Sequence, residues 1–175
     1  MAGGTVIAIL VIGKPNCEYC MDMGLAARAF GASSIIFTTP KNSRVVRYFK
    51  GLSARWGGNF NVEFTNDWRK ELDDKKNYKV VYLTRFGVPI RSVESILRTY
   101  KNLVVVVSTT DNKSAIRRAD FNVSISTQPH TNISAISVFL HEFYSGRELA
   151  LHFENARYKV VPAARGMRVA RIKKG

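Results

Sequence analysis

The sequence predicts an α/β fold, in which a mainly parallel β-sheet carries helices on both faces. Short apolar runs alternate with helical patterns along most of the chain, and such alternation is typical of parallel sheets. Two of the runs, residues 5–12 and 103–107, are apolar almost throughout, as strands covered on both sides are. A chain of 175 residues with 46% hydrophobic composition is long enough for one compact core.

The first half of the chain has clear helix stop signals. Gly31 ends one helical pattern and the pair Gly57-Gly58 ends the next, because glycine readily adopts the backbone angles that close a helix. In the second of these helices, apolar residues spaced three or four apart face inward, and basic residues form a stripe on the other side. The expected elements are strands at 5–12, 34–37 and 61–65, helices at 22–30 and 43–55, and a short helix or loop at 67–72.

The second half ends in a strand, a polar loop and an apolar helix. The loop, residues 126–132, precedes the helix at 133–144, and the amides at such a helix start can bind an anion or an RNA phosphate. The same pattern also describes an ordinary capped core helix. Pro89 fits the first turn of a helix. The expected elements are strands at 79–83, 103–107 and 121–125, and helices at 89–100, 114–119 and 133–144.

Positive charge is the second strong signal. The chain has 27 Lys and Arg against 13 Asp and Glu, a net charge of +14, and a surface this basic attracts nucleic acid. No acidic residue follows Glu154. We therefore divide the chain into a single domain, 1–163, and a basic tail, 164–175, which is either an arm that orders on RNA or a solvated tail. The predicted RNA-binding residues are Lys41, Arg44, Arg47, Lys50, Arg165, Arg168, Arg171, Lys173 and Lys174.

No segment has the roughly 20 consecutive apolar residues of a membrane span, and the start lacks a basic region and a cleavage pattern. We expect a cytoplasmic protein without membrane contact.

Five short motifs occur in an order and spacing that resemble a known family. They read Ala26-Ala27-Arg28-Ala29-Phe30-Gly31-Ala32, Arg55-Trp56-Gly57-Gly58, Val81-Tyr82-Leu83-Thr84-Arg85-Phe86-Gly87, Gln128-Pro129-His130 and Val160-Val161-Pro162-Ala163-Ala164-Arg165-Gly166. Together they resemble the archaeal tRNA cytidine ribose 2'-O-methyltransferases of the SPOUT, or trefoil-knot, class. The resemblance covers nearly the whole chain.

The resemblance implies properties that periodicity and composition do not show. It implies a C-terminal trefoil knot, a homodimer, and a methyl donor, S-adenosylmethionine, held among three loops. On this sequence the loops are 83–87, 108–113 and 126–131. The implied donor-binding residues are Leu83, Thr84, Gly87, Ser108, Gln128, Pro129, His130 and Thr131.

This chain departs from the family pattern around the expected site. Where members have Leu-Gly-His-Arg and further cations after the first strand, Lys14 is the one cation that remains. If the chain is active, the catalytic candidates are Lys14 and Arg28, although Arg28 is equally suited to an internal ion pair. Ser108 replaces a glycine of the second loop, and Arg85 is expected to bring positive charge into the donor pocket, which disfavours a sulfonium ligand.

These departures favour a catalytically degenerate relative that binds structured RNA, rRNA or tRNA, including as a ribosomal protein, and that uses no cofactor. The first alternative is an active S-adenosylmethionine-dependent tRNA or rRNA ribose 2'-O-methyltransferase. The second is a thiol oxidoreductase, because Cys17 and Cys20 form a Cys-x-x-Cys pair after a strand. The same cysteines also fit a disulfide, reduced thiols or half of a zinc site, but two local ligands do not make a metal site and none is predicted.

Overall fold

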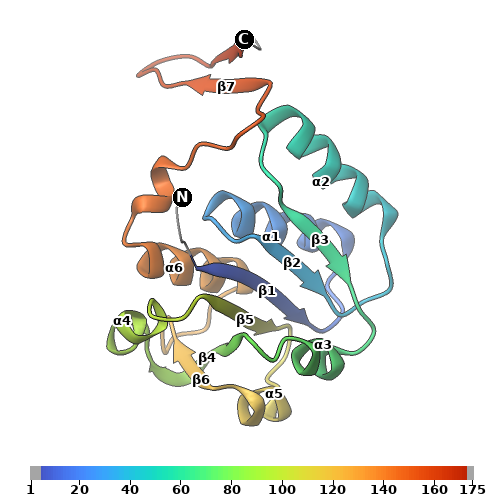
Figure 1. Ribbon diagram of the computed structural model, residues 1–175, viewed down its shortest axis with the longest axis vertical. Coiled ribbons are helices and arrows are strands. Elements are labelled where there is room, and N and C mark those ends of the chain that lie inside the picture. Colours follow the sequence, from blue (N-terminus) through green and yellow to red (C-terminus); the bar gives the residue numbers. More distant parts are fainter. Residues whose placement is uncertain (1–4, 173–175) are drawn as a thin grey trace.

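The computed structural model describes residues 5–172 and contains a six-stranded parallel sheet with helices on both faces (Figure 1). The strands follow the spatial order β3-β2-β1-β5-β4-β6, and every neighbouring pair runs parallel. The predicted α/β class is therefore confirmed. The strands are β1 (Val6–Ile12), β2 (Ser34–Phe37), β3 (Asn61–Phe64), β4 (Lys79–Pro89), β5 (Asn102–Ser108) and β6 (Phe121–Ser124).

The helices divide between the two faces because side chains alternate along each strand. On β1, Ile7 and Ile9 point toward one cluster of buried residues, whereas Ala8 and Leu10 belong to the other. The first cluster includes residues of α1, α2, α4 and α6, and the second includes residues of α3 and α5. The helices are α1 (Cys17–Ala29), α2 (Ser43–Trp56), α3 (Trp68–Asp74), α4 (Glu94–Leu97), α5 (Lys113–Arg118) and α6 (Asn132–Tyr144), with 3₁₀ turns η1 (Ile90–Ser92) and η2 (Arg147–Ala150).

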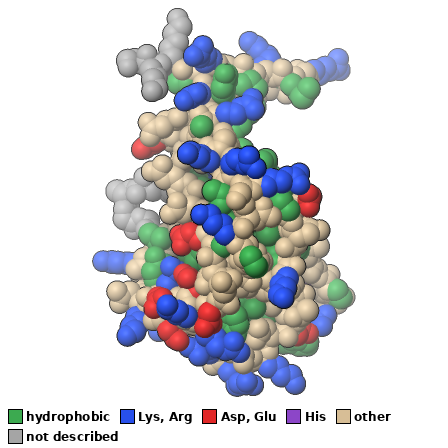
Figure 2. Space-filling view, turned by 90° about the vertical axis from the view of Figure 1, so that its right-hand side faces the viewer, with side chains coloured by type: hydrophobic (Ala, Val, Ile, Leu, Met, Phe, Trp, Pro, Cys, Tyr) green, Lys and Arg blue, Asp and Glu red, His purple; other side chains and the backbone are tan. Residues whose placement is uncertain are grey.

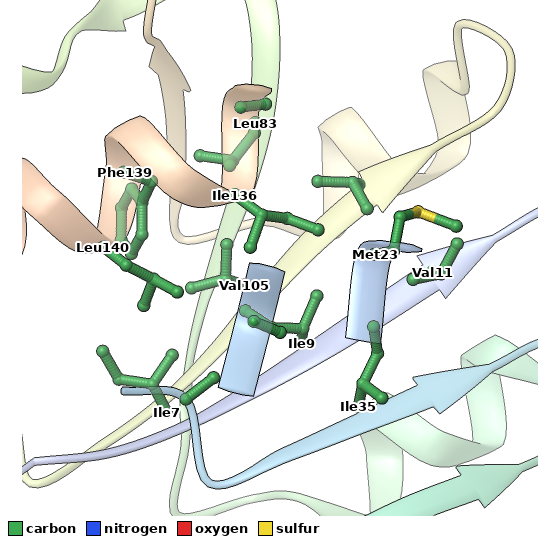
Figure 3. Packing of buried hydrophobic residues seen from close by; sticks show 14 of the residues in the cluster. Ile7, Ile9, Val11, Met23, Ile35, Leu83, Val105, Ile136, Phe139 and Leu140 are labelled. Atoms are coloured by element: carbon green, nitrogen blue, oxygen red, sulfur yellow. The ribbon is translucent and has the colours of Figure 1, made fainter. Parts of the chain in front are cut away.

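Helix α6 supplies the centre of the larger cluster. Ile136, Phe139 and Leu140 are fully buried, and Figure 3 shows them beside Val105 and the β1 side chains. The apolar helix expected at 133–144 is confirmed, beginning one residue earlier. The implied knot concerns the path of the chain around this helix and stays a prediction.

The expected helix at 89–100 is wrong. Pro89 is the last residue of β4, and the chain then forms only η1 and the single turn of α4, with an interruption at Val93 (φ −133°, ψ −11°). The fixed φ of proline suits both an extended strand and a helix start, so this signal does not separate them. Strand β4 itself continues beyond Leu83 because both Leu83 and Val88 align with Val123 of β6, and residues 84–87 loop out between them.

Helix α1 begins five residues earlier than expected. Asn16 caps it, since its side-chain Oδ1 accepts a hydrogen bond from the Tyr19 amide at 2.8 Å. The first turn of α1 therefore follows directly on the loop after β1.

The expected disordered tail is partly wrong. Strand β7 (Tyr158–Val161) pairs with β8 (Arg168–Arg171) in an antiparallel hairpin that stands apart from the sheet (Figure 1). Three backbone bonds fix its root: Gly58 N to Glu154 O, Arg157 N to Arg55 O, and Ile172 N to Arg157 O. The tail lysines Lys173 and Lys174 lie outside the described residues.

Within residues 5–172, none of the helices combines the length and apolar character that crossing a membrane requires.

Candidate functional site

The strand order places a ligand crevice at the carboxyl edge of the sheet. From β1 the chain proceeds outward to β2 and β3, whereas from β5 it crosses in the opposite direction to β6. The neighbours β1 and β5 therefore mark the point where the winding reverses, and ligands of open α/β sheets bind outside the strand ends at such a point.

A cavity of about 390 Å³ opens at this edge. Its size falls in the range of about 300–1,000 Å³ that small-molecule sites occupy. It is formed by the ends of β4 and β5, by the loop before α6, and by the first turn of α1. The lining residues are Tyr19, Tyr82, Leu83, Thr84, Arg85, Ser108, Thr109, Thr110, Asp111, Pro129, His130, Thr131 and Asn132.

The structure brings the three expected donor-binding loops together around this cavity. Six of the eight residues named from the sequence line it: Leu83, Thr84, Ser108, Pro129, His130 and Thr131. Gly87 and Gln128 are not among the lining residues. A Cβ on Gly87 would lie 2.5 Å from the backbone of Asn122, so this glycine permits close contact with β6 instead.

Hydrogen bonds between distant elements hold the loops in place. The Asn132 side-chain amide donates to the Ser108 carbonyl at 3.1 Å, and the Asn132 backbone amide donates to the Tyr19 hydroxyl at 3.3 Å. On the other side, the Asn112 amide donates to the Tyr82 hydroxyl at 3.4 Å, and burial raises the pKa of Tyr82. Three lining residues were not predicted as site residues from the sequence: Tyr19, Tyr82 and Asn132.

Gly13 allows the loop after β1 to approach the second expected loop closely. Gly13 has a φ of +120°, and a Cβ placed on it would lie 1.9 Å from Oγ1 of Thr109. The close approach of the two loops is thus achieved by a glycine on the β1 side, and Thr109 occupies the space.

The charges at the cavity form a pair. Nη2 of Arg85 lies 3.3 Å from Oδ2 of Asp111, joining the irregular segment 84–87 of β4 to the loop after β5. The Arg85 guanidinium also lies 5.0 Å from the centre of the Phe86 ring. Because Asp111 neutralises Arg85, the expected excess of positive charge in this cavity does not hold.

The two catalytic candidates are far apart in the fold. Lys14 is exposed in the loop after β1, at the cavity edge of the sheet. Arg28, at the other end of α1, is only 8% exposed and donates to the Gly57 carbonyl at 2.8 Å. Its guanidinium also lies 4.1 Å from the centre of the Phe153 ring, and burial lowers its pKa. The expectation that Arg28 lies near the active face is wrong, because its partners are internal carbonyls and an aromatic ring.

The two cysteines are free thiols in the first turn of α1. Cys20 is buried in the main core, and burial, with a smaller contribution from Cys17, raises the pKa of its thiol to about 11. Such a thiol stays protonated at neutral pH and packs as a small apolar side chain. Among residues 5–172, no group of three or more His, Cys, Asp or Glu side chains is placed to hold a metal ion.

Basic side chains are exposed along α2 and the hairpin. Figure 2 shows Lys and Arg residues on the hairpin and over the body below it. In α2 the apolar residues Val45 and Phe49 are buried, as expected, while the basic residues are exposed. Arg44 is paired with Glu18 at 3.0 Å. The exposed basic residues of this surface are Lys41, Arg44, Arg47, Lys50, Arg55, Arg157, Lys159, Arg165, Arg168 and Arg171.

Residues 56–170 match the model of a family described as "tRNA ribose 2'-O-methyltransferase, aTrm56". Three similar proteins are each named tRNA (cytidine(56)-2'-O)-methyltransferase. The one from Cenarchaeum symbiosum is 41% identical over 83% of both chains, and the one from Methanopyrus kandleri is 36% identical over 85% of both. The one from Thermococcus kodakarensis is 34% identical over 95% of this chain and 98% of that protein.

Solved structures share the fold at low sequence identity. An RNA 2'-O ribose methyltransferase superimposes with a TM-score of 0.61 at 15% identity, covering 83% of this chain and 58% of that chain. The TrmH/SpoU tRNA modifying enzyme of A. aeolicus gives a TM-score of 0.59 at 15% identity, covering 83% and 76%. The SpoU methyltransferase AviRb of Streptomyces viridochromogenes, in complex with AdoMet, gives 0.56 at 16%, covering 84% and 59%.

Proposed function

We propose, from the premise that this chain belongs to the tRNA ribose 2'-O-methyltransferase family, that it transfers a methyl group from S-adenosylmethionine to a ribose 2'-oxygen of tRNA. The membership confirms the resemblance stated from the sequence motifs. The observation that carries the proposal is the cavity at the carboxyl edge of the sheet, where the three expected loops meet.

The expectation of a catalytically degenerate RNA-binding protein is wrong. It rested on missing cations and on altered loops, but the relatives that match this chain over most of its length are named as methyltransferases. The expectation that no cofactor is used depended on the same interpretation and is not supported either. The names of these relatives do not support a ribosomal role. The active enzyme, given first as an alternative, is the better interpretation.

The residues around the cavity suit S-adenosylmethionine. The cavity has adequate volume, the ion pair of Arg85 with Asp111 leaves no excess positive charge to repel a sulfonium, and the glycine at position 13 relieves the crowding of the second loop. We assign Leu83, Thr84, Ser108 and the residues 129–131 to donor binding. Gly87 packs against the Asn122 backbone of β6, and Gln128 is exposed in the loop before α6, so neither is assigned to donor binding.

When bound, S-adenosylmethionine supplies a methyl group on a positively charged sulfur, and the ribose oxygen displaces the neutral thioether. The chain has to hold the ribose and to stabilise the negative charge that grows on its oxygen as the hydroxyl proton passes to water. We assign the charge stabilisation to Lys14, an exposed residue of the loop after β1 that lies outside the cavity lining at the same edge of the sheet. Arg28 has no part in this site.

We assign tRNA binding to the basic surface of α2 and the hairpin. Phosphate contacts need exposed cations and make binding depend on salt. Residues Lys41, Arg44, Arg47, Lys50, Arg165, Arg168 and Arg171 are exposed there. Because the named relatives modify a cytidine, we propose a cytidine ribose as the target. The reaction would take place in the cytoplasm.

A homodimer, implied by the family resemblance, is part of the proposal. Sedimentation equilibrium of the full chain tests it directly, since a mass near twice that of one chain is expected and a monomer at all accessible concentrations contradicts it.

The main test is methyl transfer from labelled S-adenosylmethionine to transcribed tRNA, followed by nuclease digestion and mass analysis of the nucleosides. We expect 2'-O-methylcytidine at one site. Thr110→Trp, which puts a bulky ring at the cavity lining, should abolish transfer, whereas Asn66→Trp in an exposed loop outside the lining should not. If the unaltered protein neither binds S-adenosylmethionine nor transfers its methyl group, the proposal is refuted.

A further inference from the structure

The ion pair of Arg85 with Asp111 is the distinctive charged feature of the cavity. Among the described lining residues, these two side chains carry full charges, and His130 is the other titratable group with basic character. The remaining lining residues are hydroxyl, amide, aromatic or apolar. A charged group of a bound molecule can therefore pair with an opposite charge at one place in the cavity, the Arg85–Asp111 pair.

Apart from its sulfonium, the proposed donor has its charges at one end. Its adenosine part is uncharged, whereas its amino-acid part carries an α-carboxylate and an α-ammonium on the same carbon. Ionised groups that leave water require partners of opposite charge or strong hydrogen bonds. A guanidinium beside a carboxylate presents the complementary arrangement, with a donor for the carboxylate and an acceptor for the ammonium.

The pair can receive such a group without separating. The contact between the two side chains uses Nη2 of Arg85 and Oδ2 of Asp111 at 3.3 Å. A guanidinium has five N–H donors and a carboxylate has two oxygens, so Nη1 of Arg85 and Oδ1 of Asp111 keep capacity for a ligand. Both side chains are accessible, with exposed fractions of 42% and 63%.

We propose that Arg85 and Asp111 form the subsite for the amino-acid end of the methyl donor, with Arg85 binding its α-carboxylate and Asp111 its α-ammonium. This inference rests on the proposed function and adds a specificity role for two residues. The family pattern did not suggest it, because members often have methionine at the position of Arg85. The uncharged remainder of the cavity then takes the nucleoside.

Two neutral-sulfur nucleosides separate this role from general cofactor binding. S-adenosylhomocysteine carries the amino acid, whereas 5'-methylthioadenosine lacks it. We expect Arg85→Met and Asp111→Asn each to weaken S-adenosylhomocysteine binding on the order of 10- to 100-fold, as loss of a charge-assisted hydrogen bond does. Binding of 5'-methylthioadenosine should change less than twofold. Calorimetric titration of the full chain measures both.

A third nucleoside separates the two side chains. Decarboxylated S-adenosylmethionine keeps the ammonium but has no α-carboxylate. Its affinity should be at least as high for Arg85→Met as for the unaltered protein, because Asp111 still accepts from the ammonium, and it should be lower for Asp111→Asn. The matched control is Arg91→Met, which removes an arginine from another 3.3 Å ion pair, with Glu142, away from the cavity. It should bind all the nucleosides normally.

The outcomes distinguish the inference from the function. If Arg85→Met and Asp111→Asn weaken S-adenosylhomocysteine and 5'-methylthioadenosine equally, the pair only ties the two loops together and the subsite is refuted. If both variants bind S-adenosylhomocysteine normally, it is refuted as well. Failure of the unaltered protein to bind any of these nucleosides would instead refute the proposed function.

Discussion

Replacing Arg28 with methionine should destabilise the fold and leave catalysis intact. The guanidinium donates to the Gly57 carbonyl at 2.8 Å and, more weakly, to the Trp56 carbonyl at 3.4 Å. It also stacks on Phe153, so it links α1 to the end of α2 and to the chain that leads into the hairpin. Methionine retains similar bulk but can satisfy neither carbonyl.

The expected loss follows from these contacts. A hydrogen bond to a charged group contributes about 1.5–3 kcal/mol, and a partly buried cation–π contact contributes about 1 kcal/mol. Burying the charge offsets part of this, as the lowered pKa of Arg28 and its buried, unpartnered Nε indicate. We expect a net loss of about 2–3 kcal/mol, equivalent to about 5–10 °C in melting temperature for a chain of this size.

Urea denaturation followed by circular dichroism measures the loss, and single-turnover methyl transfer measures the chemistry. Arg44→Met is the stability control, because Arg44 and Glu18 form an exposed pair that should contribute less than about 1 kcal/mol. A large drop in the single-turnover rate of Arg28→Met, with a change of less than about 0.5 kcal/mol in its free energy of unfolding, would show that Arg28 acts in catalysis.

Further predictions concern the core, the buried thiol, the charge stabilisation and the hairpin. Phe139→Ala should lower the free energy of unfolding in denaturant by about 3–5 kcal/mol, because the ring is fully buried. The control Val138→Ala, at an exposed neighbouring position, should lower it by less than about 1 kcal/mol. Equal losses would contradict the packing. Burial raises the pKa of the Cys20 thiol from 9.0 in the unfolded chain to about 11 in the folded protein. Because the unfolded chain loses this proton first, the free energy of unfolding should fall as pH rises from about 9 to about 11. Cys20→Ala should flatten that decline in urea titrations between pH 8 and 10.5, and an unchanged slope would count against the burial argument. Lys14→Ala should lower the single-turnover rate about 100-fold without weakening donor binding, and Lys14→Arg should restore part of it; a normal rate would remove Lys14 from the mechanism. Replacing Arg168, Arg171, Lys173 and Lys174 together with alanine should weaken tRNA binding. The slope of the logarithm of the binding constant against the logarithm of the salt concentration should become shallower by about 0.9 for each phosphate contact that is lost. Lys76→Ala, on the exposed turn after α3, is the control, and an unchanged slope in the fourfold variant would exclude these residues from binding.

The sequence predicts the sheet well because its strands carry strong local signals. The boundaries of β2 agree with the expected 34–37, and β5 extends 103–107 by one residue at each end. Apolar runs of this kind are buried wherever they lie in the sheet, so no tertiary information is needed to recognise them.

The errors arise where a distant partner decides the local structure. The hairpin depends on pairing Val160 with Val169 across a six-residue connection without a short-turn signature, and its root depends on the end of α2. Beyond Leu83, β4 continues only because β6 offers Val123 and Ser124 as partners for Val88 and Pro89. Single-sequence periodicity does not contain such information.

The candidate site shows the same division. Motif resemblance identified six lining residues, because each loop has its own short pattern. It missed Tyr19 and Tyr82, since the Tyr19 hydroxyl meets an amide 113 positions further along the chain and the Tyr82 hydroxyl meets one 30 positions further. It misjudged Arg85 because its partner, Asp111, belongs to a different loop.

The hairpin is attached to the rest of the molecule through a narrow root, and that attachment has a consequence for how the family diversifies. Its contacts with the end of α2 combine backbone hydrogen bonds with the close approach that Gly57 permits and a contact between the Trp56 and Tyr158 rings. If the hairpin binds tRNA as we propose, exposed side chains of β7 and β8 can vary without altering the cavity at the carboxyl edge of the sheet. An exchange of residues 159–171 between homologues, which keeps Tyr158 at the root, would then be expected to change tRNA preference and leave donor binding unchanged.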